Sequence, residues 1–309
     1  MARPLVIGSR GSKLALWQAE QARDRLRSLN PAIDIRIEII KTTGDMKSDP
    51  LSIIGGKGVF TKELEEALLD GRIDLAVHSL KDLPTILPEN LAITAICERE
   101  DPRDALVLRA DLRMENSSLL QLPQRAVVGT SSQRRLAQLK SLRSDIVIKD
   151  LRGNVDTRIR KLDEGQYDAV ILASAGLVRL GLQDRITARI PISEMLPAVG
   201  QGAIAIETRI DNELGVQTTA RLDHRETRLA CLAERAFLRG LGGGCQFPIA
   251  AHAIIDREQL KLDGLVASPD GSEILRGSLT SDNAANADEI GSKLAAELLE
   301  RGAGTLLHG

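Results

Sequence analysis

Three stretches of the sequence place arginine beside small hydroxyl residues where a strand gives way to a helix. They read GSRGS, GTSSQRR and LRGNVDTR. The first turn of a helix has unpaired N–H groups and a partial positive charge, and arginine pairs bidentately with carboxylates. Each stretch therefore predicts an anion site, although a Ser or Thr N-cap beside a solvated helix face is the alternative. The candidate residues are Arg10, Ser12, Thr130, Ser132, Arg134, Arg135, Arg152 and Arg158.

A lysine and an aspartate follow the apolar run IDLAVHSL. Lys81 and Asp82 then lie at the end of a predicted strand, which is the usual ligand side of an open α/β sheet. Asp82 could transfer protons or stabilise a cationic intermediate. A surface turn before Pro84 is the alternative. His78, inside the run, is interpreted as a core or rim histidine rather than a catalyst.

One cysteine lies behind a run of glycines in GLGGGCQFP, residues 240–248. Glycine lets the backbone approach a bulky group closely, so a bulky group could sit against Cys245. Cys245 could equally be a small buried residue beside a tight turn. A cysteine nucleophile of the hydrolase type needs an imidazole base, for which His252 is the nearby candidate.

The elements that carry these residues alternate between strand and helix over the first two thirds of the chain. Helices are predicted over 12–29 and 58–71, the latter ending at Gly71, and strands over 33–40 and 73–80. Strand, turn and helix then recur three times over 125–182. LLDGRIDLAVHS and KLDEGQYDAVILAS resemble each other, as do IGSRGSKLALWQ and VGTSSQRRLAQL. These echoes predict two related α/β domains, whose cleft would be a natural ligand site.

The last third follows another pattern. A helix over 226–241 precedes the glycine loop, and three strand-like runs follow over 248–256, 259–268 and 272–280. A final helix is predicted over 284–301. This pattern indicates a smaller α+β domain that carries Cys245.

Composition narrows the function classes. The 309 residues carry a net charge of −2, but residues 125–160 hold nine Arg or Lys against three Asp. Aromatic residues are only 2% of the chain, which argues against base stacking and thus against nucleic acid. Three cysteines without C-x-x-C spacing and four scattered histidines give no support for a disulfide framework or a metal. No apolar run is long enough for a membrane span, and no signal peptide is recognisable, so we expect a cytoplasmic protein.

Together the motifs resemble the porphobilinogen deaminase (hydroxymethylbilane synthase) family. The resemblance rests on GSRGSKLALWQ, GGKGVFTKELEEALLDGRIDLAVHSLKDLPT, CEREDPRDA, VGTSSQRRLAQL, LRGNVDTRIRKLDEGQYDAVILA, LPAVGQGA and GGGCQFPI. Their order and spacing are kept from about residue 5 to the last helix. One departure is Ile53, where family members often carry a lysine.

The resemblance implies an activity and roles for residues. The enzyme would join four porphobilinogen molecules head to tail, with loss of ammonia, on a covalent dipyrromethane primer, and release linear hydroxymethylbilane by hydrolysis. Cys245 would hold the primer through a thioether, and Asp82 would be catalytic. Cofactor-binding residues would be Lys81, Asp82, Thr130, Ser132, Arg134, Arg135 and Arg158. Substrate-binding residues would be Arg10, Ser12, Arg152, Arg158 and Arg179.

The resemblance also implies a fold of two periplasmic-binding-protein-like α/β domains with a hinge and a smaller C-terminal α+β domain. The expected domains are 1–97 with 200–219, 98–199, and 220–309. We expect a monomer with porphobilinogen as substrate, no metal, and no nucleic-acid or membrane partner. Two rival hypotheses are a non-catalytic anion-binding protein on the same scaffold and a cysteine hydrolase.

Overall fold

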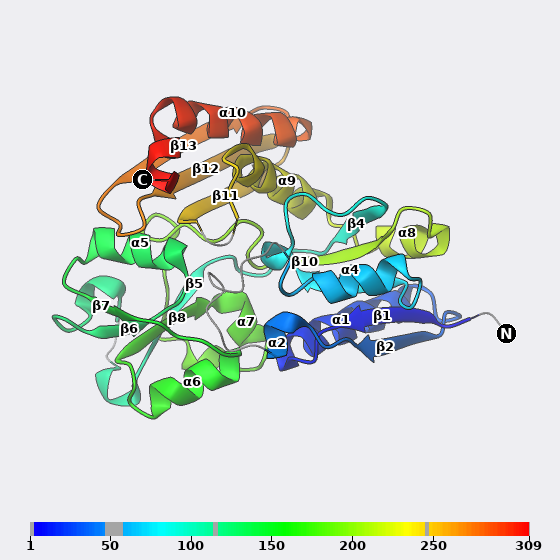
Figure 1. Ribbon diagram of the computed structural model, residues 1–309, viewed down its shortest axis with the longest axis horizontal. Helices are drawn as coiled ribbons and strands as arrows, with labels where there is room; N and C mark the ends of the chain where they lie inside the picture. Colours follow the sequence, from blue (N-terminus) through cyan, green and yellow to red (C-terminus); the bar gives the residue numbers. More distant parts are fainter. Residues whose placement is uncertain (1–2, 47–57, 114–116, 245–246, 309) are drawn as a thin grey trace. The chain divides into compact units, whose positions relative to one another are not determined.

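The computed structural model describes residues 3–46, 58–113, 117–244 and 247–308, which form two compact units (Figure 1). Unit 1 contains Met1–Arg99 and Ala203–Arg228, and unit 2 contains Glu100–Gly202 and Leu229–Gly309. The chain therefore passes between the units after residues 99, 202 and 228. Cys245 and Ile53 lie outside the described residues.

Unit 1 is built on a five-stranded sheet of order β2-β1-β3-β10-β4. The strands are β1 (Leu5–Ser9), β2 (Ile35–Ile39), β3 (Leu75–Ser79), β4 (Leu91–Ile96) and β10 (Ile204–Arg209). The first three are parallel, and β10 runs antiparallel to both β3 and β4.

Helices cover both faces of this sheet. Helix α1 (Lys13–Leu29) packs Ala19, Ala22 and Leu26 against the sheet, and α4 (Lys62–Leu69) packs Leu64 and Leu68 in a second apolar cluster. Helix α4 ends where Gly71 adopts φ +69°, as the sequence predicts. The remaining elements are α2 (Thr43–Met46), the 3₁₀ turn η1 (Leu80–Asp82) and α8 (Glu213–Ala220).

The first sheet of unit 2 repeats this topology with order β7-β6-β8-β5-β9. Its strands are β5 (Asp104–Leu108), β6 (Val127–Gly129), β7 (Val147–Lys149), β8 (Ala169–Ala173) and β9 (Ala188–Arg189). Strands β6, β7 and β8 are parallel, and β5 runs antiparallel between β8 and β9. The helices are α5 (Gln133–Leu142), α6 (Val155–Asp163) and α7 (Ser174–Arg179), and the 3₁₀ turns are η2 (Ala110–Leu112), η3 (Leu119–Gln121) and η4 (Gln183–Arg185).

The two sheets also share a hydrogen bond made by aspartates that occupy matching places in the two similar stretches of sequence. The Asp74 carboxylate accepts a 2.8 Å hydrogen bond from Val6 N just before β3, and Asp168 accepts one of 2.8 Å from Val127 N just before β8. The residue before β3 is thus hydrogen-bonded to β1, and the residue before β8 is hydrogen-bonded to β6. The predicted fold class, with two related α/β sheets, is confirmed.

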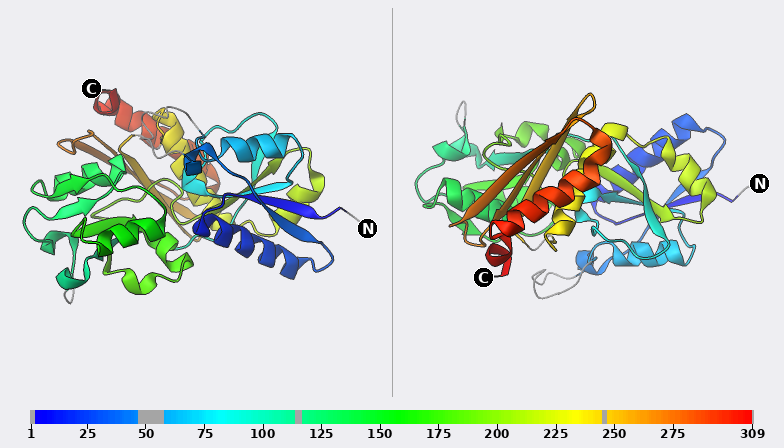
Figure 2. Two further views of the ribbon diagram at one scale, coloured as in Figure 1. Left: turned by 60° about the horizontal axis from the view of Figure 1, so that its bottom comes forward. Right: turned by 90° about the horizontal axis from the view of Figure 1, so that it is seen from above.

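The C-terminal part of unit 2 forms the predicted α+β region. Strands β11 (Ile249–Asp256), β12 (Gln259–Ala267) and β13 (Ile274–Ser281) form an antiparallel sheet. Helices α9 (Arg225–Gly240) and α10 (Ala287–Glu300) pack on one face, with the 3₁₀ turn η5 (Ala284–Asn286) and α11 (Ala303–His308) (Figure 2). Near one end of the sheet, Gly271 has φ +75° and approaches α5 so closely that a Cβ would lie 2.3 Å from Ala137 O.

Candidate functional site

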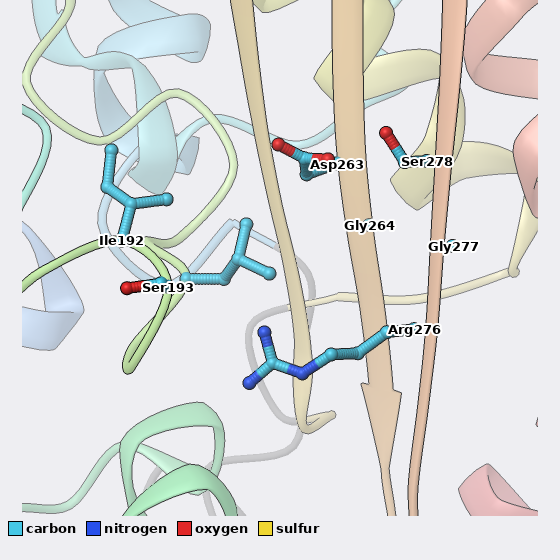
Figure 3. Close-up of a pocket in the computed structure, with 8 residues that line it drawn as sticks. Ile192, Ser193, Asp263, Gly264, Arg276, Gly277 and Ser278 are labelled. Atoms are coloured by element: carbon cyan, nitrogen blue, oxygen red, sulfur yellow. The ribbon is translucent and has the colours of Figure 1, made fainter.

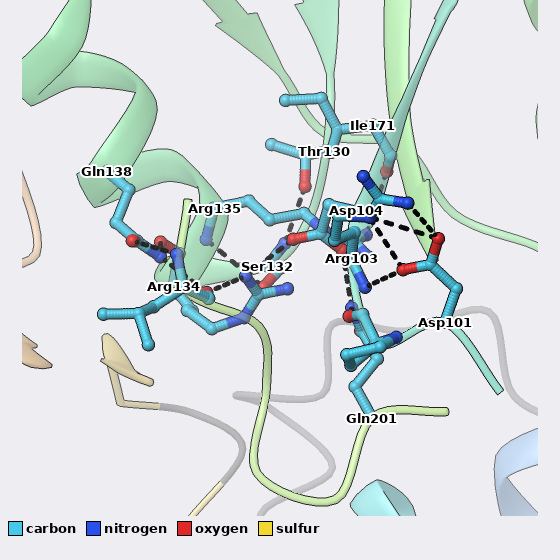
Figure 4. Close-up of polar contacts among 12 residues, drawn as sticks. Asp101, Arg103, Asp104, Thr130, Ser132, Arg134, Arg135, Gln138, Ile171 and Gln201 are labelled. Carbon is cyan, nitrogen blue, oxygen red and sulfur yellow. Dashed lines mark hydrogen bonds and ion pairs between the residues drawn. The ribbon is translucent and has the colours of Figure 1, made fainter. Parts of the chain in front are cut away.

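Two arginines at the start of α5 share one buried carboxylate (Figure 4). Arg134 Nη1 lies 2.7 Å from Asp104 Oδ2, and Arg135 donates to Asp104 Oδ1 from Nη2 at 2.7 Å and from Nε at 3.1 Å. Asp104 is fully buried, and the arginines are 5% and 6% exposed. The first residue of β5 and the first turn of α5 therefore meet in an ionic cluster.

Backbone and amide groups fix the geometry of this cluster. Arg134 Nη1 also donates to Leu196 O at 2.7 Å, and Arg135 Nη1 donates to Ile171 O at 2.9 Å. Gln201 Nε2 donates to Asp104 Oδ1 at 2.9 Å. With these partners neither guanidinium can rotate freely, so the site is preorganised.

The cluster carries excess positive charge. Burial alone would raise the pKa of Asp104, but the charges and hydrogen bonds of Arg134 and Arg135 outweigh burial and hold that pKa well below its usual range. Burial lowers the pKa of Arg134, and Asp104 opposes this shift. Two guanidiniums face one carboxylate, and the buried Arg134 Nε finds no hydrogen-bond partner among the described residues. An unpaired buried donor beside surplus positive charge favours a further anionic group.

The hydroxyls before α5 serve the backbone. Ser132 Oγ accepts from Arg135 N at 3.5 Å as the N-cap, and Thr130 Oγ1 accepts from Ser132 N at 3.2 Å. In unit 1, Ser12 Oγ caps α1 in the same way by accepting from Ala15 N at 3.3 Å. Both serines thus act as N-caps, and the capped helix start places Arg134 and Arg135. The solvated helix face expected with such a cap is wrong for α5, because both arginines are buried.

The turn before α6, helix α6 and the end of α7 position three further arginines of unit 2. Arg152 Nε lies 2.7 Å from Asp150 Oδ2, and Arg158 Nε donates to Gly153 O at 2.7 Å. Arg179, 9% exposed, donates from Nη2 to Gly202 O at 2.6 Å. Each guanidinium is oriented by at least one of these contacts.

Three predicted site residues of unit 1 lie beyond the ends of β1 and β3. The Arg10 guanidinium stacks over the Phe60 ring, 4.2 Å from its centroid. Lys81 and Asp82 are half-buried in η1, which is closed by a hydrogen bond from Leu83 N to Leu80 O at 3.2 Å. Within the described residues, no hydrogen bond or ion pair to the Asp82 carboxylate is found, so this carboxylate is held by its backbone alone.

The sequence analysis missed the residues that complete the arginine cluster. Asp104 lies 30 positions before Arg134, and Gln201 lies 97 positions after Asp104. One signal was available in the sequence, because Asp104 begins the otherwise apolar run DALVL, and the structure buries this strand throughout. A carboxylate in such a run needs a cationic partner. The buried pair of His78 Nε2 and Glu207 Oε2, 3.0 Å apart in unit 1, was also unforeseen.

The described part of the chain contains no group of three or more His, Cys, Asp or Glu residues able to hold a metal ion. None of the helices in that same part is long and apolar enough to cross a membrane.

Known proteins resemble this chain over nearly its whole length. The family description "Porphobilinogen deaminase, dipyromethane cofactor binding domain" matches residues 5–216, and "Porphobilinogen deaminase, C-terminal domain" matches residues 228–300. A porphobilinogen deaminase of Pelotomaculum thermopropionicum is 51% identical over 308 residues, which cover 99% of this chain and 97% of that protein. One of Syntrophomonas wolfei is 50% identical over 306 residues, which cover 99% and 98%.

Solved structures resemble it more remotely. The VFT2 domain of Bordetella pertussis BvgS is 14% identical with a TM-score of 0.42, over 71% of this chain and 85% of that domain. The fold assignment therefore rests on the strand orders described above.

Proposed function

Because this chain belongs to the porphobilinogen deaminase family, we propose that it joins four porphobilinogen molecules head to tail on a dipyrromethane primer and then releases linear hydroxymethylbilane by hydrolysis. Each addition would release ammonia, and the product would enter tetrapyrrole biosynthesis. The observation that carries the proposal is the buried Asp104–Arg134–Arg135 cluster, which lies within the matched cofactor-binding domain.

The residues of this cluster fit a polycarboxylate cofactor. Its surplus positive charge and the unpartnered Arg134 Nε suit a carboxylate, which accepts hydrogen bonds bidentately from guanidinium groups. We assign the cofactor to Arg134, Arg135, Thr130, Ser132 and Arg158, with Cys245 as the covalent anchor. When bound, the dipyrromethane supplies the ring to which the first substrate is attached.

The remaining cofactor contacts are assigned to Lys81 and Asp82 in unit 1. Asp82 also receives the catalytic role, because its half-buried carboxylate has no partner among the described residues. It would stabilise the positive charge that develops on the substrate ring as ammonia leaves, and it would accept a proton at a carboxylate oxygen. Its place in a hydrogen-bonded 3₁₀ turn supports a fixed position for this charge.

The other arginines would bind the acetate and propionate groups of the substrate. Arg10, Ser12, Arg152, Arg158 and Arg179 are assigned to this role. The contacts of Arg10 with Phe60, of Arg152 with Asp150 and of Arg179 with Gly202 orient these side chains before substrate arrives. Preorientation reduces the entropy lost when an anion binds.

Three broader expectations belong to the same proposal. The chain would divide functionally into residues 1–97 with 200–219, residues 98–199 and residues 220–309. It would act as a monomer in the cytoplasm. It would use porphobilinogen without a nucleic-acid or membrane partner.

Intact mass of the purified protein tests the proposal. We expect an adduct the size of two linked pyrroles on the parent chain, lost in Cys245→Ser. Cys97→Ser and Cys231→Ser are the matched controls, since both thiols are buried at 5% and 0% exposure and should leave the adduct in place. An adduct that persists in Cys245→Ser would refute the anchor, and a parent chain without any adduct would favour a non-catalytic anion-binding protein.

A further inference from the structure

An open pocket lies in unit 2, on the face of the three-stranded sheet away from α9 and α10. Its volume is about 550 Å³, within the range of small-molecule sites. Ile192, Ser193 and Leu196 line it from the segment after β9, and Asp263, Arg276 and Ser278 line it from β12 and β13 (Figure 3). None of these residues is used in the proposed reaction.

Arg276 is the basic group of this pocket, and it is an exposed residue of β13. Its side chain reaches across the sheet face toward the segment that carries Ser193 (Figure 3). Although Arg276 is exposed, partial desolvation by the pocket walls lowers the pKa of its guanidinium, and the nearby Asp263 carboxylate offsets part of the shift. Among the residues that the structure describes, no hydrogen bond or ion pair to the guanidinium is found. Asp263 is instead paired with Lys261, whose Nζ lies 3.2 Å from Oδ2.

The remaining walls restrict what could pair with Arg276. The hydroxyls of Ser193 and Ser278 can donate to an oxyanion, and Ile192 and Leu196 offer an apolar wall to the body of a ligand. The Asp263 carboxylate disfavours a second negative charge. The cavity therefore suits a monoanion with an apolar body better than a phosphate dianion.

We propose that this cavity is a binding site for a small organic carboxylate, whose carboxylate pairs with Arg276 and whose apolar body packs on Ile192 and Leu196. A guanidinium presents a planar fork that matches a carboxylate. The site would be separate from the Asp104 cluster. Leu196 would contact both, because its backbone oxygen accepts from Arg134 Nη1 at 2.7 Å while its side chain lines the cavity.

The test uses the cofactor-loaded protein, so that the residues assigned to the cofactor are already covered. Benzoate is titrated against protein labelled at isoleucine methyl groups, and the Ile192 methyl signal is assigned with Ile192→Val. We expect the signal to shift saturably, with a Kd on the order of 1 mM for so small a ligand. Inorganic phosphate at the same concentrations should leave it in place.

Two arginine variants test whether Arg276 binds the benzoate carboxylate. Arg276→Gln should weaken benzoate binding about 10- to 100-fold, the loss typical of a hydrogen bond to a charged group. Arg257→Gln is the control, because Arg257 lies in the β11–β12 turn, near the other end of the sheet from Arg276. Ser278→Ala, at an exposed position, is a second variant in case Arg276→Gln does not fold. It should weaken benzoate binding about fivefold.

Three results would overturn the proposal. The Ile192 signal could remain unmoved by benzoate. It could shift equally in Arg276→Gln and in the parent. Phosphate could shift it as strongly as benzoate, which would exclude an organic carboxylate as the preferred ligand.

Discussion

Replacing Asp104 with asparagine should destabilise unit 2 more than removing either arginine that it binds. Asparagine keeps the shape but removes the charge, and it turns one acceptor oxygen into an N–H donor. Arg134 and Arg135 both donate to Asp104, so at least one guanidinium would lose its acceptor in a fully buried place. Removing one partner of a buried pair costs about 3–5 kcal/mol.

The arginine variants should cost less, because each leaves the other ion pair intact. Arg134→Leu and Arg135→Leu should each lose about 1–3 kcal/mol. The matched control is Asp101→Asn. Asp101 also meets two arginines, Arg103 at 2.7 Å and Arg189 at 3.0 Å, but its side chain is 17% exposed and theirs are about 40% exposed. Its loss should stay near 1 kcal/mol.

Thermal melting followed by circular dichroism measures these differences. All variants are made in a Cys245→Ser background, since loss of a bound cofactor would itself lower the melting temperature. At about 2–4 °C per kcal/mol for a domain of this size, Asp104→Asn should melt about 10 °C below its parent at neutral pH.

The pH dependence gives a second check on the same variant. The folded-state pKa of Asp104 lies below its unfolded value, so its ion pairs stabilise the protein above about pH 4 and this contribution is lost as the pH falls further. The gap between Asp104→Asn and its parent should therefore narrow below about pH 4. A melting temperature like that of Asp101→Asn at neutral pH would refute the reasoning.

Two further predictions concern the catalytic aspartate and a glycine turn. Asp82→Asn should keep a primer loaded from preformed tetrapyrrole, but in single turnover it should form enzyme-bound pyrrole chains roughly 100- to 1,000-fold more slowly. Asp82→Glu keeps the charge and should keep part of the rate. Near-normal rates in Asp82→Asn would remove the catalytic role. Gly271→Ala should lower the melting temperature more than Gly181→Ala. Both glycines have positive φ, but only at Gly271 would a Cβ lie 2.3 Å from Ala137 O. Equal losses of melting temperature in the two variants would contradict this contact.

Much of the fold could be predicted because its determinants are local. The alternation of strands and helices, the end of α4 at Gly71 and the three C-terminal strands all follow from spacing within a few residues. The duplication was visible too, since Asp74 and Asp168 occupy matching places in two similar stretches. Strand order follows less directly, because β10 joins a sheet whose other strands end at residue 96.

The candidate site was only half predictable. The helix starts that hold Ser12, Ser132, Arg134 and Arg135 follow from the sequence, because N-caps are local. Their expected partner was a ligand anion alone, whereas the structure buries both arginines against Asp104. Asp104 lies 30 positions before Arg134 in the sequence, so no rule of local spacing indicates this contact. The sequence thus predicted the places of Arg134 and Arg135 at the start of a helix, but it did not predict the Asp104 carboxylate that orients them.

The position of β10 has a consequence for synthesis on the ribosome. This strand lies between β3 and β4, yet about 110 residues separate the end of β4 from its start, which is roughly 5–20 s of translation. The sheet from β5 to β9 is contiguous in sequence and can assemble during that interval. The nascent N-terminal sheet meanwhile keeps unpaired strand edges, which tend to associate with other chains. Ribosome-bound chains that end before residue 204 should therefore be the form most in need of chaperones.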